Sequence, residues 1–270
     1  MEQKKWNRND RRPPLRRAQE PSEAAENMLE GRNAVQEALA AGRPIDKLYI
    51  AAGETDRALA RLAAMAKEAG AAVVETDRRK LDQLSATGAH QGVVAMVAAH
   101  AYATVDEILE NAKSRGEAPL IVLCDDLSDP HNLGAIIRTA ECAGAHGVII
   151  PKRRSVGLTA VVGKASAGAL EYLPVARVSN LVSTIRDLQK AGVWVFGTAA
   201  DGDTGLYAAD LKGPAAIVIG NEGEGMSRLV KESCDFILSL PMKGQVSSLN
   251  ASAAAAVTMY EVLRQRSAQG

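Results

Sequence analysis

The chain has 270 residues, 47% of them hydrophobic, which is enough for two domains that each bury an apolar core. Basic and acidic residues number 32 each, so the zero net charge excludes RNA binding through an overall positive charge. No apolar run reaches the roughly 18 residues that span a bilayer, and the charged start of the chain lacks the apolar middle of a signal peptide. The three cysteines are too far apart for a disulfide framework or a zinc site. We therefore expect a cytoplasmic protein with no metal and no membrane partner.

Residues 1–26 form a basic tail for which we predict no regular structure, because prolines interrupt it and apolar residues are few. Residues 1–17 hold seven basic and two acidic side chains. Such an arm binds phosphate groups without sequence preference. A solvated tail that touches nothing explains the same composition, and the sequence leaves both interpretations open.

The pattern of apolar segments over residues 27–100 predicts a small α/β domain. Apolar side chains on one face, among them Val35 and Leu39, indicate a helix over residues 31–41. The further predicted elements are a strand at 46–50, a helix at 55–69 with Thr55 as its cap, a strand at 71–74, a helix at 78–84 and a strand at 91–98. Residues 101–116 follow as a linker that contains a helix over 105–113.

The pattern of apolar segments over residues 117–270 predicts a second, larger α/β domain. Strands are predicted at 119–124, 147–150, 193–197, 215–219 and 236–240, and helices at 132–144, 180–191, 225–232 and 249–266. Apolar strands that are separated by helices form a parallel sheet with helices on both faces.

Two polar loops follow the last two predicted strands. The first, Gly220 to Gly225, is rich in glycine, which lets the main chain turn sharply and approach a ligand closely. The second runs from Pro241 to Ser252. We expect the two strands to be neighbours, so that their loops form a ligand crevice at the carboxyl edge of the sheet.

The side chains of these loops allow several roles. Glu222 suits a general base, a structural partner or a solvated charge. Ser248 and Asn250 suit either a functional role or the cap of the last helix, because both residue types cap helices readily.

A third polar segment follows the strand at 119–124. Asp129 and Pro130 start a turn, and Asn132 and Arg138 lie somewhat less than two helical turns apart, so both can reach one rim of the sheet. The Arg138 guanidinium suits a phosphate or a carboxylate. A structural ion pair with Glu222 is the alternative.

A basic loop follows the strand at 147–150. It contains Lys152, Arg153 and Arg154, and Lys164 comes soon after. These side chains would hold RNA phosphates if the loop lies near the site. The alternative is a solvated loop.

The three polar segments, in this order, resemble a known family. The SpoU (TrmH) family of RNA 2′-O-ribose methyltransferases, in the SPOUT superfamily, has three motifs similar to Asp129-Pro130-His131-Asn132-Leu133-Gly134 with Arg138, to Gly220-Asn221-Glu222-Gly223, and to Leu240-Pro241-Met242 with Ser248-Leu249-Asn250-Ala251-Ser252. The family's substrate-binding domain, which has an L30e-like fold, is resembled by Gly31-Arg32-Asn33-Ala34-Val35 and His90-Gln91-Gly92-Val93. The resemblance covers residues 28–266 and is closest to the RlmB-type branch, which methylates a guanosine of 23S rRNA. Asn221 and Ala251 stand where relatives often carry Ala and Val.

The resemblance implies a fold, a cofactor and a set of site residues. The fold is a SPOUT parallel sheet with a carboxyl-terminal trefoil knot, the cofactor is S-adenosylmethionine, and the assembly is a homodimer with its active site near the dimer interface. Cofactor contacts are implied for Thr198, Gly220, Asn221, Leu240, Met242, Ser248 and Leu249. Catalytic or substrate-positioning roles are implied for Asn132, Arg138, Glu222, Ser248 and Asn250.

The resemblance thus predicts methyl transfer to a ribose 2′-hydroxyl, with a guanosine of 23S rRNA, or of its assembly intermediate, as the target. A tRNA ribose methyltransferase of the same family, or a catalytically silent RNA-binding protein with the same fold, are the alternatives. Relatives are proposed to use the arginine equivalent to Arg138 as a base. We expect Arg138 instead to hold phosphate and stabilise charge, with Glu222 orienting it, because a guanidinium has a pKa above about 12 and keeps its proton.

Overall fold

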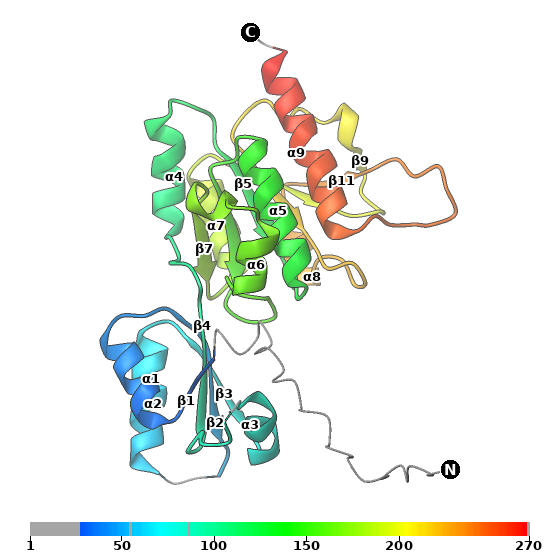
Figure 1. Ribbon diagram of the computed structural model, residues 1–270. Helices are drawn as coiled ribbons and strands as arrows, with labels where there is room; N and C mark the ends of the chain where they lie inside the picture. The colour runs from blue at the N-terminus through cyan, green and yellow to red at the C-terminus, as the bar shows by residue number, and fades with distance from the viewer. Residues whose placement is uncertain (1–27, 54–55, 86, 269–270) are drawn as a thin grey trace, which may run out of the picture.

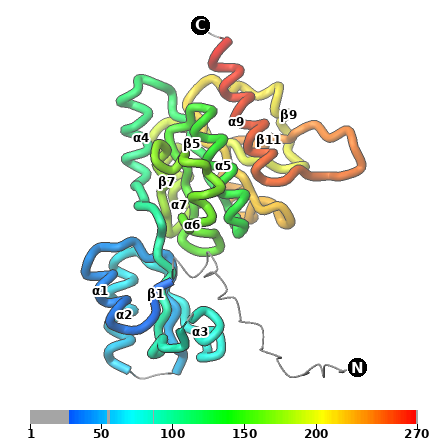
Figure 2. The backbone as a smooth tube through the Cα atoms, in the orientation of Figure 1, coloured from blue at the N-terminus to red at the C-terminus, as the bar shows by residue number. Residues whose placement is uncertain are grey.

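The computed structural model describes residues 28–53, 56–85 and 87–268. The basic tail predicted for residues 1–26 lies outside the described residues. The chain forms two units, each built on its own sheet, and a single connection passes from β4 in the first unit to α4 in the second (Figures 1 and 2). The α/β fold class predicted for both units is confirmed.

The amino-terminal unit is a four-stranded sheet covered by three helices. Its elements are β1 (Met28–Glu30), α1 (Arg32–Ala40), β2 (Ile45–Ala51), α2 (Arg57–Glu68), β3 (Ala72–Thr76), α3 (Arg78–Leu84) and β4 (Val93–Val97). The strand order is β1-β4-β2-β3, and β2 and β3 are parallel while the other two pairs are antiparallel. The sequence did not predict β1, which has three residues and no alternating pattern.

The two faces of this sheet carry different helices. Leu48 in β2 belongs to the same buried cluster as Val35 of α1 and Leu59 of α2, whereas Leu81 of α3 packs with Val94 on the other face. Helix α2 is capped by Asp56, whose carboxylate accepts a hydrogen bond from the Ala58 amide at 2.8 Å. The predicted cap Thr55 lies outside the described residues.

The carboxyl-terminal unit is a seven-stranded, wholly parallel sheet with helices on both faces. Its strands are β5 (Leu120–Cys124), β6 (Gly147–Pro151), β7 (Val175–Val178), β8 (Trp194–Thr198), β9 (Thr204–Gly205), β10 (Ala215–Ile219) and β11 (Phe236–Ser239). Its helices are α4 (Val105–Ser114), α5 (Pro130–Cys142), α6 (Ala160–Ala165), α7 (Leu181–Lys190), α8 (Arg228–Ser233) and α9 (Ala251–Ser267), with 3-10 turns at Ala169–Glu171 and Leu206–Ala208. All six strand pairs are parallel, as the sequence predicted.

Both faces of the large sheet are buried, which explains its nearly continuous apolar strands. In β5, Val122 faces the core under α5 and α9, whereas Ile121 faces the core under α4 and α7. Helix α4, predicted within a linker, packs its buried Ile108 into that second core. The short β7, β9 and α6 were not predicted because each has six residues or fewer and little pattern.

The strand order corrects one expectation. The order is β7-β6-β5-β10-β8-β11-β9, so β8 lies between the two strands that were expected to be neighbours, β10 and β11. Apolar pattern identifies a buried strand, but it carries no information on which strand lies beside it. The trefoil knot implied by the resemblance stays a prediction.

Candidate active site

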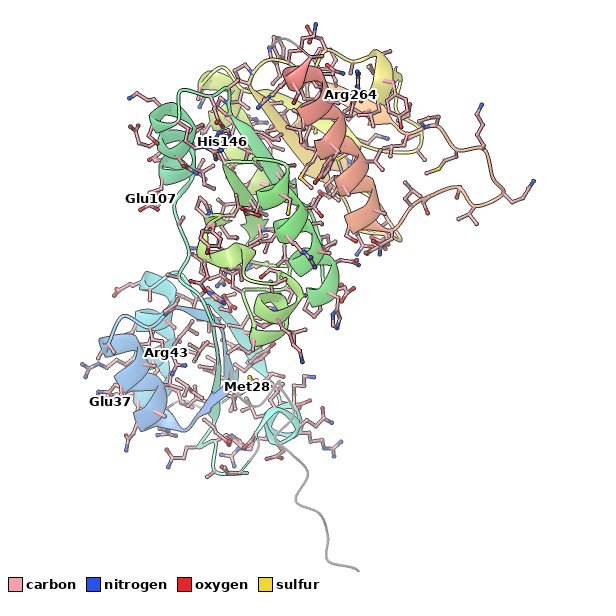
Figure 3. All side chains as sticks on the ribbon, turned by 45° about the horizontal axis from the view of Figure 1, so that its top comes forward. Met28, Glu37, Arg43, Glu107, His146 and Arg264 are labelled. Atoms are coloured by element: carbon pink, nitrogen blue, oxygen red, sulfur yellow. The ribbon has the colours of Figure 1, made fainter. Side chains whose placement is uncertain are left out.

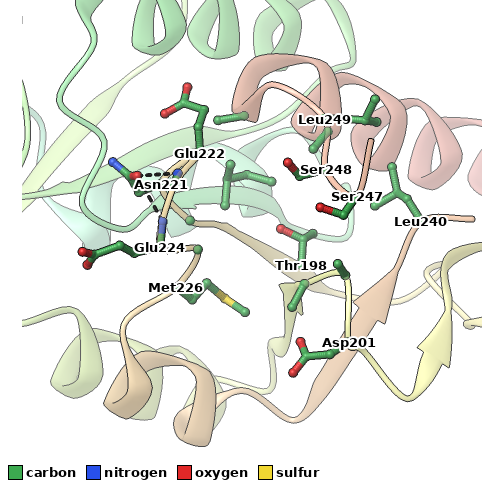
Figure 4. Close-up of a pocket in the computed structure, with 18 of the residues that line it drawn as sticks. Thr198, Asp201, Asn221, Glu222, Glu224, Met226, Leu240, Ser247, Ser248 and Leu249 are labelled. Carbon is green, nitrogen blue, oxygen red and sulfur yellow. Dashed lines mark hydrogen bonds between the residues drawn. The ribbon is translucent and has the colours of Figure 1, made fainter. Parts of the chain in front are cut away.

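A cavity of about 410 Å³ opens at the carboxyl ends of β8, β10 and β11 (Figure 4). The loops after these three strands supply its walls, and the first residues of α9 close one side. All seven residues for which cofactor contact was implied line this cavity: Thr198, Gly220, Asn221, Leu240, Met242, Ser248 and Leu249. The crevice therefore forms where the sequence predicted it, although β8 contributes a third loop.

The loop after β10 is held in one closed turn. Asn221 and Gly225 exchange main-chain hydrogen bonds of 3.0 and 2.9 Å, and the Asn221 side-chain oxygen accepts from the Gly223 amide at 2.8 Å. The Asn221 amide group also donates to the main-chain oxygen of Asp126 at 3.0 Å. Gly225 has a φ of 71°, a conformation that glycine adopts without strain. The turn is thus fixed both internally and to the loop after β5.

Gly220 has no room for a side chain. A Cβ atom there would lie 2.3 Å from the main-chain carbon of Gly225 and from the amide nitrogen of Met226. Any other residue would force the two ends of the loop apart. Glycine at this position therefore sets the shape of the cavity wall.

Asn132 ties three segments together at the rim of the cavity. It is 9% exposed, and its amide donates a hydrogen bond to Glu222 Oε1. Its side-chain oxygen accepts a hydrogen bond of 2.9 Å from Asn250 Nδ2. The segments after β5, β10 and β11 are thus joined through one buried amide, and this juxtaposition cannot be seen in the sequence.

Asn250 also caps α9. Its side-chain oxygen accepts from the amides of Ser252 and Ala253 at 2.9 and 3.3 Å. Asn250 therefore caps the helix with its oxygen and contacts Asn132 with its nitrogen, while its role in the reaction stays a prediction. Ser248 makes no cap and lines the cavity instead.

Arg138 lies apart from this cluster. It is exposed on α5, it does not line the cavity, and within the described residues it makes no hydrogen bond or ion pair. The expected pairing of Arg138 with Glu222 is therefore wrong for the single chain. The reason is the fold, which leaves Arg138 exposed on α5 and brings Asn132 to the Glu222 carboxylate.

The basic residues lie on a neighbouring part of the same sheet edge. Lys152, Arg153 and Arg154 follow β6, which pairs with β5. Arg153 and Arg154 are exposed, whereas Lys152 Nζ lies beside Gly70 of the amino-terminal unit, 2.9 Å from where a Cβ would be. Lys164 is exposed in the last turn of α6.

Sequence reasoning missed several residues of the cavity. Asp201 accepts hydrogen bonds of 2.7 and 2.8 Å from Lys231, and these bonds lower the pKa of its carboxyl. Glu224 and Met226 also line the wall. Asp201 comes shortly after β8, so the rule that ligands bind at the carboxyl ends of strands was the one signal that pointed to it.

The charges around the cavity favour a cation. The lining residues include three carboxylates, from Asp201, Glu222 and Glu224, and one amino group, that of Lys231, which pairs with Asp201. Within residues 28–53, 56–85 and 87–268, no cluster of three His, Cys, Asp or Glu side chains could hold a metal ion. No helix in the described part of the chain is long and apolar enough to cross a membrane.

Comparison with known proteins identifies the family. Residues 119–260 match the SpoU rRNA Methylase family, and residues 28–103 match the family described as RNA 2′-O ribose methyltransferase substrate binding. The chain is 49% identical over 240 residues to YacO of Bacillus subtilis (strain 168), named as a TrmH family tRNA/rRNA methyltransferase. That match covers 89% of this chain and 96% of the relative.

Solved structures of RNA methyltransferases resemble the fold of this chain. The SpoU methyltransferase AviRb from Streptomyces viridochromogenes, in complex with S-adenosylmethionine, superposes with a TM-score of 0.57 at 28% identity, over 89% of this chain and 90% of that one. An S-adenosylmethionine-bound rRNA methyltransferase from Sinorhizobium meliloti gives 0.55 at 27% identity, over 88% and 86%. A TrmH/SpoU tRNA-modifying enzyme of A. aeolicus gives 0.52 at 26% identity, but over 57% of this chain and 78% of that one.

The matched families span both units of the chain, and the cavity gathers the motif residues that the resemblance assigned to the cofactor. The chain therefore belongs to the SpoU family and is an S-adenosylmethionine-dependent RNA 2′-O-ribose methyltransferase.

Proposed function

We propose that the protein methylates the 2′-hydroxyl of a guanosine in 23S rRNA. The observation that carries this choice is the substrate-binding unit, residues 28–103, attached to the catalytic unit. The rRNA methyltransferase of Sinorhizobium meliloti aligns with both units, whereas the tRNA-modifying enzyme of A. aeolicus aligns over little more than half of the chain. Because ribosomal RNA is the proposed substrate, we place the protein in the cytoplasm.

The residues that line the cavity suit the charge of S-adenosylmethionine. The cofactor supplies a methyl group on a positively charged sulfonium. Glu222 and Glu224 would give the wall the complementary negative charge, since Asp201 is paired with Lys231. Gly220, Leu240 and Leu249 would hold the cofactor through main-chain groups and apolar contact, and Thr198 is fixed by a hydrogen bond of 2.9 Å to the Val218 oxygen.

The residues at the rim then position and deprotonate the ribose. The ribose 2′-hydroxyl must lose its proton when it is methylated, so the site needs a proton acceptor. Glu222 is the carboxylate whose orientation Asn132 fixes, and we assign it the role of proton acceptor. Holding the hydroxyl in line with the methyl group supplies most of the lowering of the barrier.

We propose that the protein is a homodimer in which Arg138 of one chain acts in the active site of the other. In one chain Arg138 is exposed and outside its own cavity. Helix α5 packs against α9, whose outer face exposes Val257 (37%) and Tyr260 (49%), one turn apart. We infer that these helices pair with those of a second copy and that Arg138 reaches the partner's site, where its guanidinium binds phosphate and stabilises developing negative charge.

The experiment is methyl transfer to natural RNA. The protein is incubated with labelled S-adenosylmethionine and total RNA from a strain that lacks the gene, and the labelled nucleotide is mapped. We expect one 2′-O-methylguanosine in 23S rRNA. Label in tRNA would establish the alternative substrate, and the matched variant Glu222→Gln should incorporate far less label into either RNA.

A further inference from the structure

A cluster of two buried side chains and one partly buried side chain joins the two units of the molecule. Asp46 comes from β2, Tyr102 from the connection after β4, and Arg177 from β7 of the catalytic unit. The side chains of Asp46 and Arg177 are only 4% and 6% exposed. The Arg177 guanidinium forms an ion pair with Asp46 Oδ1 and also donates to the Asp46 main-chain oxygen.

Tyr102 completes the cluster. Its hydroxyl donates to Asp46 Oδ1 at 2.5 Å and accepts from the Leu158 amide at 2.9 Å. The Arg177 guanidinium lies over its ring, 5.2 Å from the ring centre. Burial and the Asp46 carboxylate raise the pKa of Tyr102, so the phenol keeps the proton that it donates. A carboxylate and a guanidinium out of water are stable only with such partners, so each of the three groups depends on the other two.

The surrounding chain is shaped to admit this cluster. A Cβ at Gly157 would lie 2.0 Å from Asp46 Oδ2, so glycine is what lets the Asp46 side chain enter the catalytic unit. The connection itself is bonded on both sides, because Ala98 donates to Pro44 at 2.9 Å and Ala103 donates to Val175 at 2.9 Å. The path between the units is therefore a fixed joint and not a free tether.

We propose that Asp46, Tyr102 and Arg177 are positioning residues that fix the substrate-binding unit relative to the methyl-transfer cavity and so select the nucleotide that enters it. An RNA held by a rigidly placed unit presents one ribose to the cavity, whereas a swinging unit presents several and each for less time. The inference rests on the methyl-transfer activity of the family and is independent of which RNA is the target.

The test compares two arginines of the same chain. Arg177→Met removes the charge that joins the units, and Arg186→Met changes an exposed arginine on α7 as the matched control. Spin labels at Glu37→Cys and Ser183→Cys, both exposed, report the distance between the units in a Cys142→Ser background (Figure 3 shows Glu37 on the outer surface). Cys124 is buried, and burial raises the pKa of the partly buried Cys234 thiol to about 12, which disfavours the thiolate that reacts with the label.

For Arg177→Met we expect a broadened distance distribution and a KM for the accepting RNA raised about tenfold, or label spread to neighbouring nucleotides. Its affinity for S-adenosylmethionine should change less than about twofold, because the cavity is untouched. Arg186→Met should match the unchanged protein in all three readouts. The apolar double variant Asp46→Leu with Arg177→Met should recover part of the narrow distribution, because it leaves no buried charge unpaired.

Two results would overturn the proposal. One is an unchanged distance distribution in Arg177→Met. The other is a broadened distribution with unchanged KM and an unchanged modification site, which would reduce the cluster to a stabilising contact. If Arg177→Met fails to fold by circular dichroism, Tyr102→Phe, which removes one hydroxyl, decides the question by the same readouts.

Discussion

At the scale of single residues, Asn132 holds the site together, because one buried amide bonds Glu222 on one side and Asn250 on the other. We expect Asn132→Ala to lower kcat about 10- to 100-fold, because it removes the hydrogen bonds to Glu222 and Asn250 at the rim of the cavity. The affinity for S-adenosylmethionine should change little, because Asn132 does not line the cavity. Single-turnover methyl transfer and calorimetry measure the two effects.

Asn132→Asp separates the two contacts of this residue. It keeps an acceptor for Asn250 but places a carboxylate against Glu222, so it should lose at least as much rate as Asn132→Ala. A rate near that of the unchanged protein would show that the contact with Glu222 has no part in the reaction.

Arg138 allows a second prediction, which decides between a base and a positioning group. Arg138→Lys keeps the charge but loses the planar fork, and Arg138→Ala loses both. If Arg138 holds phosphate and stabilises charge, both variants lose single-turnover rate, the alanine more, by roughly 10- to 150-fold for a lost contact of about 1.5–3 kcal/mol. A lysine variant whose rate approaches normal at high pH, with an alanine variant that binds RNA normally, would instead identify a base.

At this scale, motif residues were predictable and their partners were not. Thr198, Leu240 and Ser248 were assigned to the cofactor from the resemblance, and all three line the cavity, while their contact with the cofactor stays a prediction. The partner of Glu222 was misjudged, because charge alone suggested Arg138, whereas the fold places the neutral Asn132 within bonding distance. Hydrogen bonds between segments far apart in sequence depend on the three-dimensional arrangement.

At the scale of elements, the loop after β10 provides a matched pair of glycines. A Cβ at Gly220 would collide with the main chain of Gly225 and Met226, whereas a Cβ at Gly223 would meet only the Asn221 side chain at 3.4 Å. We expect Gly220→Ala to weaken S-adenosylmethionine binding at least about tenfold and Gly223→Ala to leave it nearly unchanged. Equal affinities of the two variants, measured by calorimetry, would contradict a wall that depends on this close approach.

Helix α9 carries a carboxylate whose pKa links stability to pH. Arg264 and Gln265 donate hydrogen bonds of 2.7–2.8 Å to Glu261 and lower its pKa to about 2. A lowered carboxyl pKa means stabilisation that is fully present above the ordinary value of 4.5 and is lost as pH falls through about 2.

Glu261→Gln should therefore lower Tm by about 2–4 °C at pH 7, and the difference from the unchanged protein should shrink below about pH 4. Glu110→Gln is the control, because Glu110 pairs with Lys113 at the same spacing but on an exposed surface, where such pairs contribute little. A difference that stays constant from pH 7 to pH 3 would rule out the linkage.

At the scale of the whole molecule, the proposed dimer can be tested by mixing two inactive variants. Arg138→Ala and Glu222→Gln each damage one group of the site. If Arg138 acts in the partner's site, half of the randomly mixed dimers hold one intact site of two, so activity should recover to roughly a quarter of normal. If Arg138 acts within its own chain, mixing restores nothing. Sedimentation of the mixture, showing dimers at micromolar concentration, is the control.

The strands of the sheet were predictable where both of their faces are buried, because burial there requires apolar residues. Apolar runs such as Ala215–Ile219 predicted strands of a parallel sheet, because a strand that is covered on both faces has no polar positions. The insertion of β8 between β10 and β11 was not predictable, since strand order follows from chain crossings. Short elements such as β9, with two residues, are stabilised by their neighbours and leave no local pattern.

The central position of β10 has a consequence for synthesis on the ribosome. β10 pairs with β5 on one side and with β8 on the other, and both partners precede it in the chain. Until Ala215–Ile219 has been translated, β5 and β8 each present an unpaired edge, and such edges promote association between nascent chains. A pause in translation before Ala215 therefore lengthens the period in which the growing protein is open to aggregation.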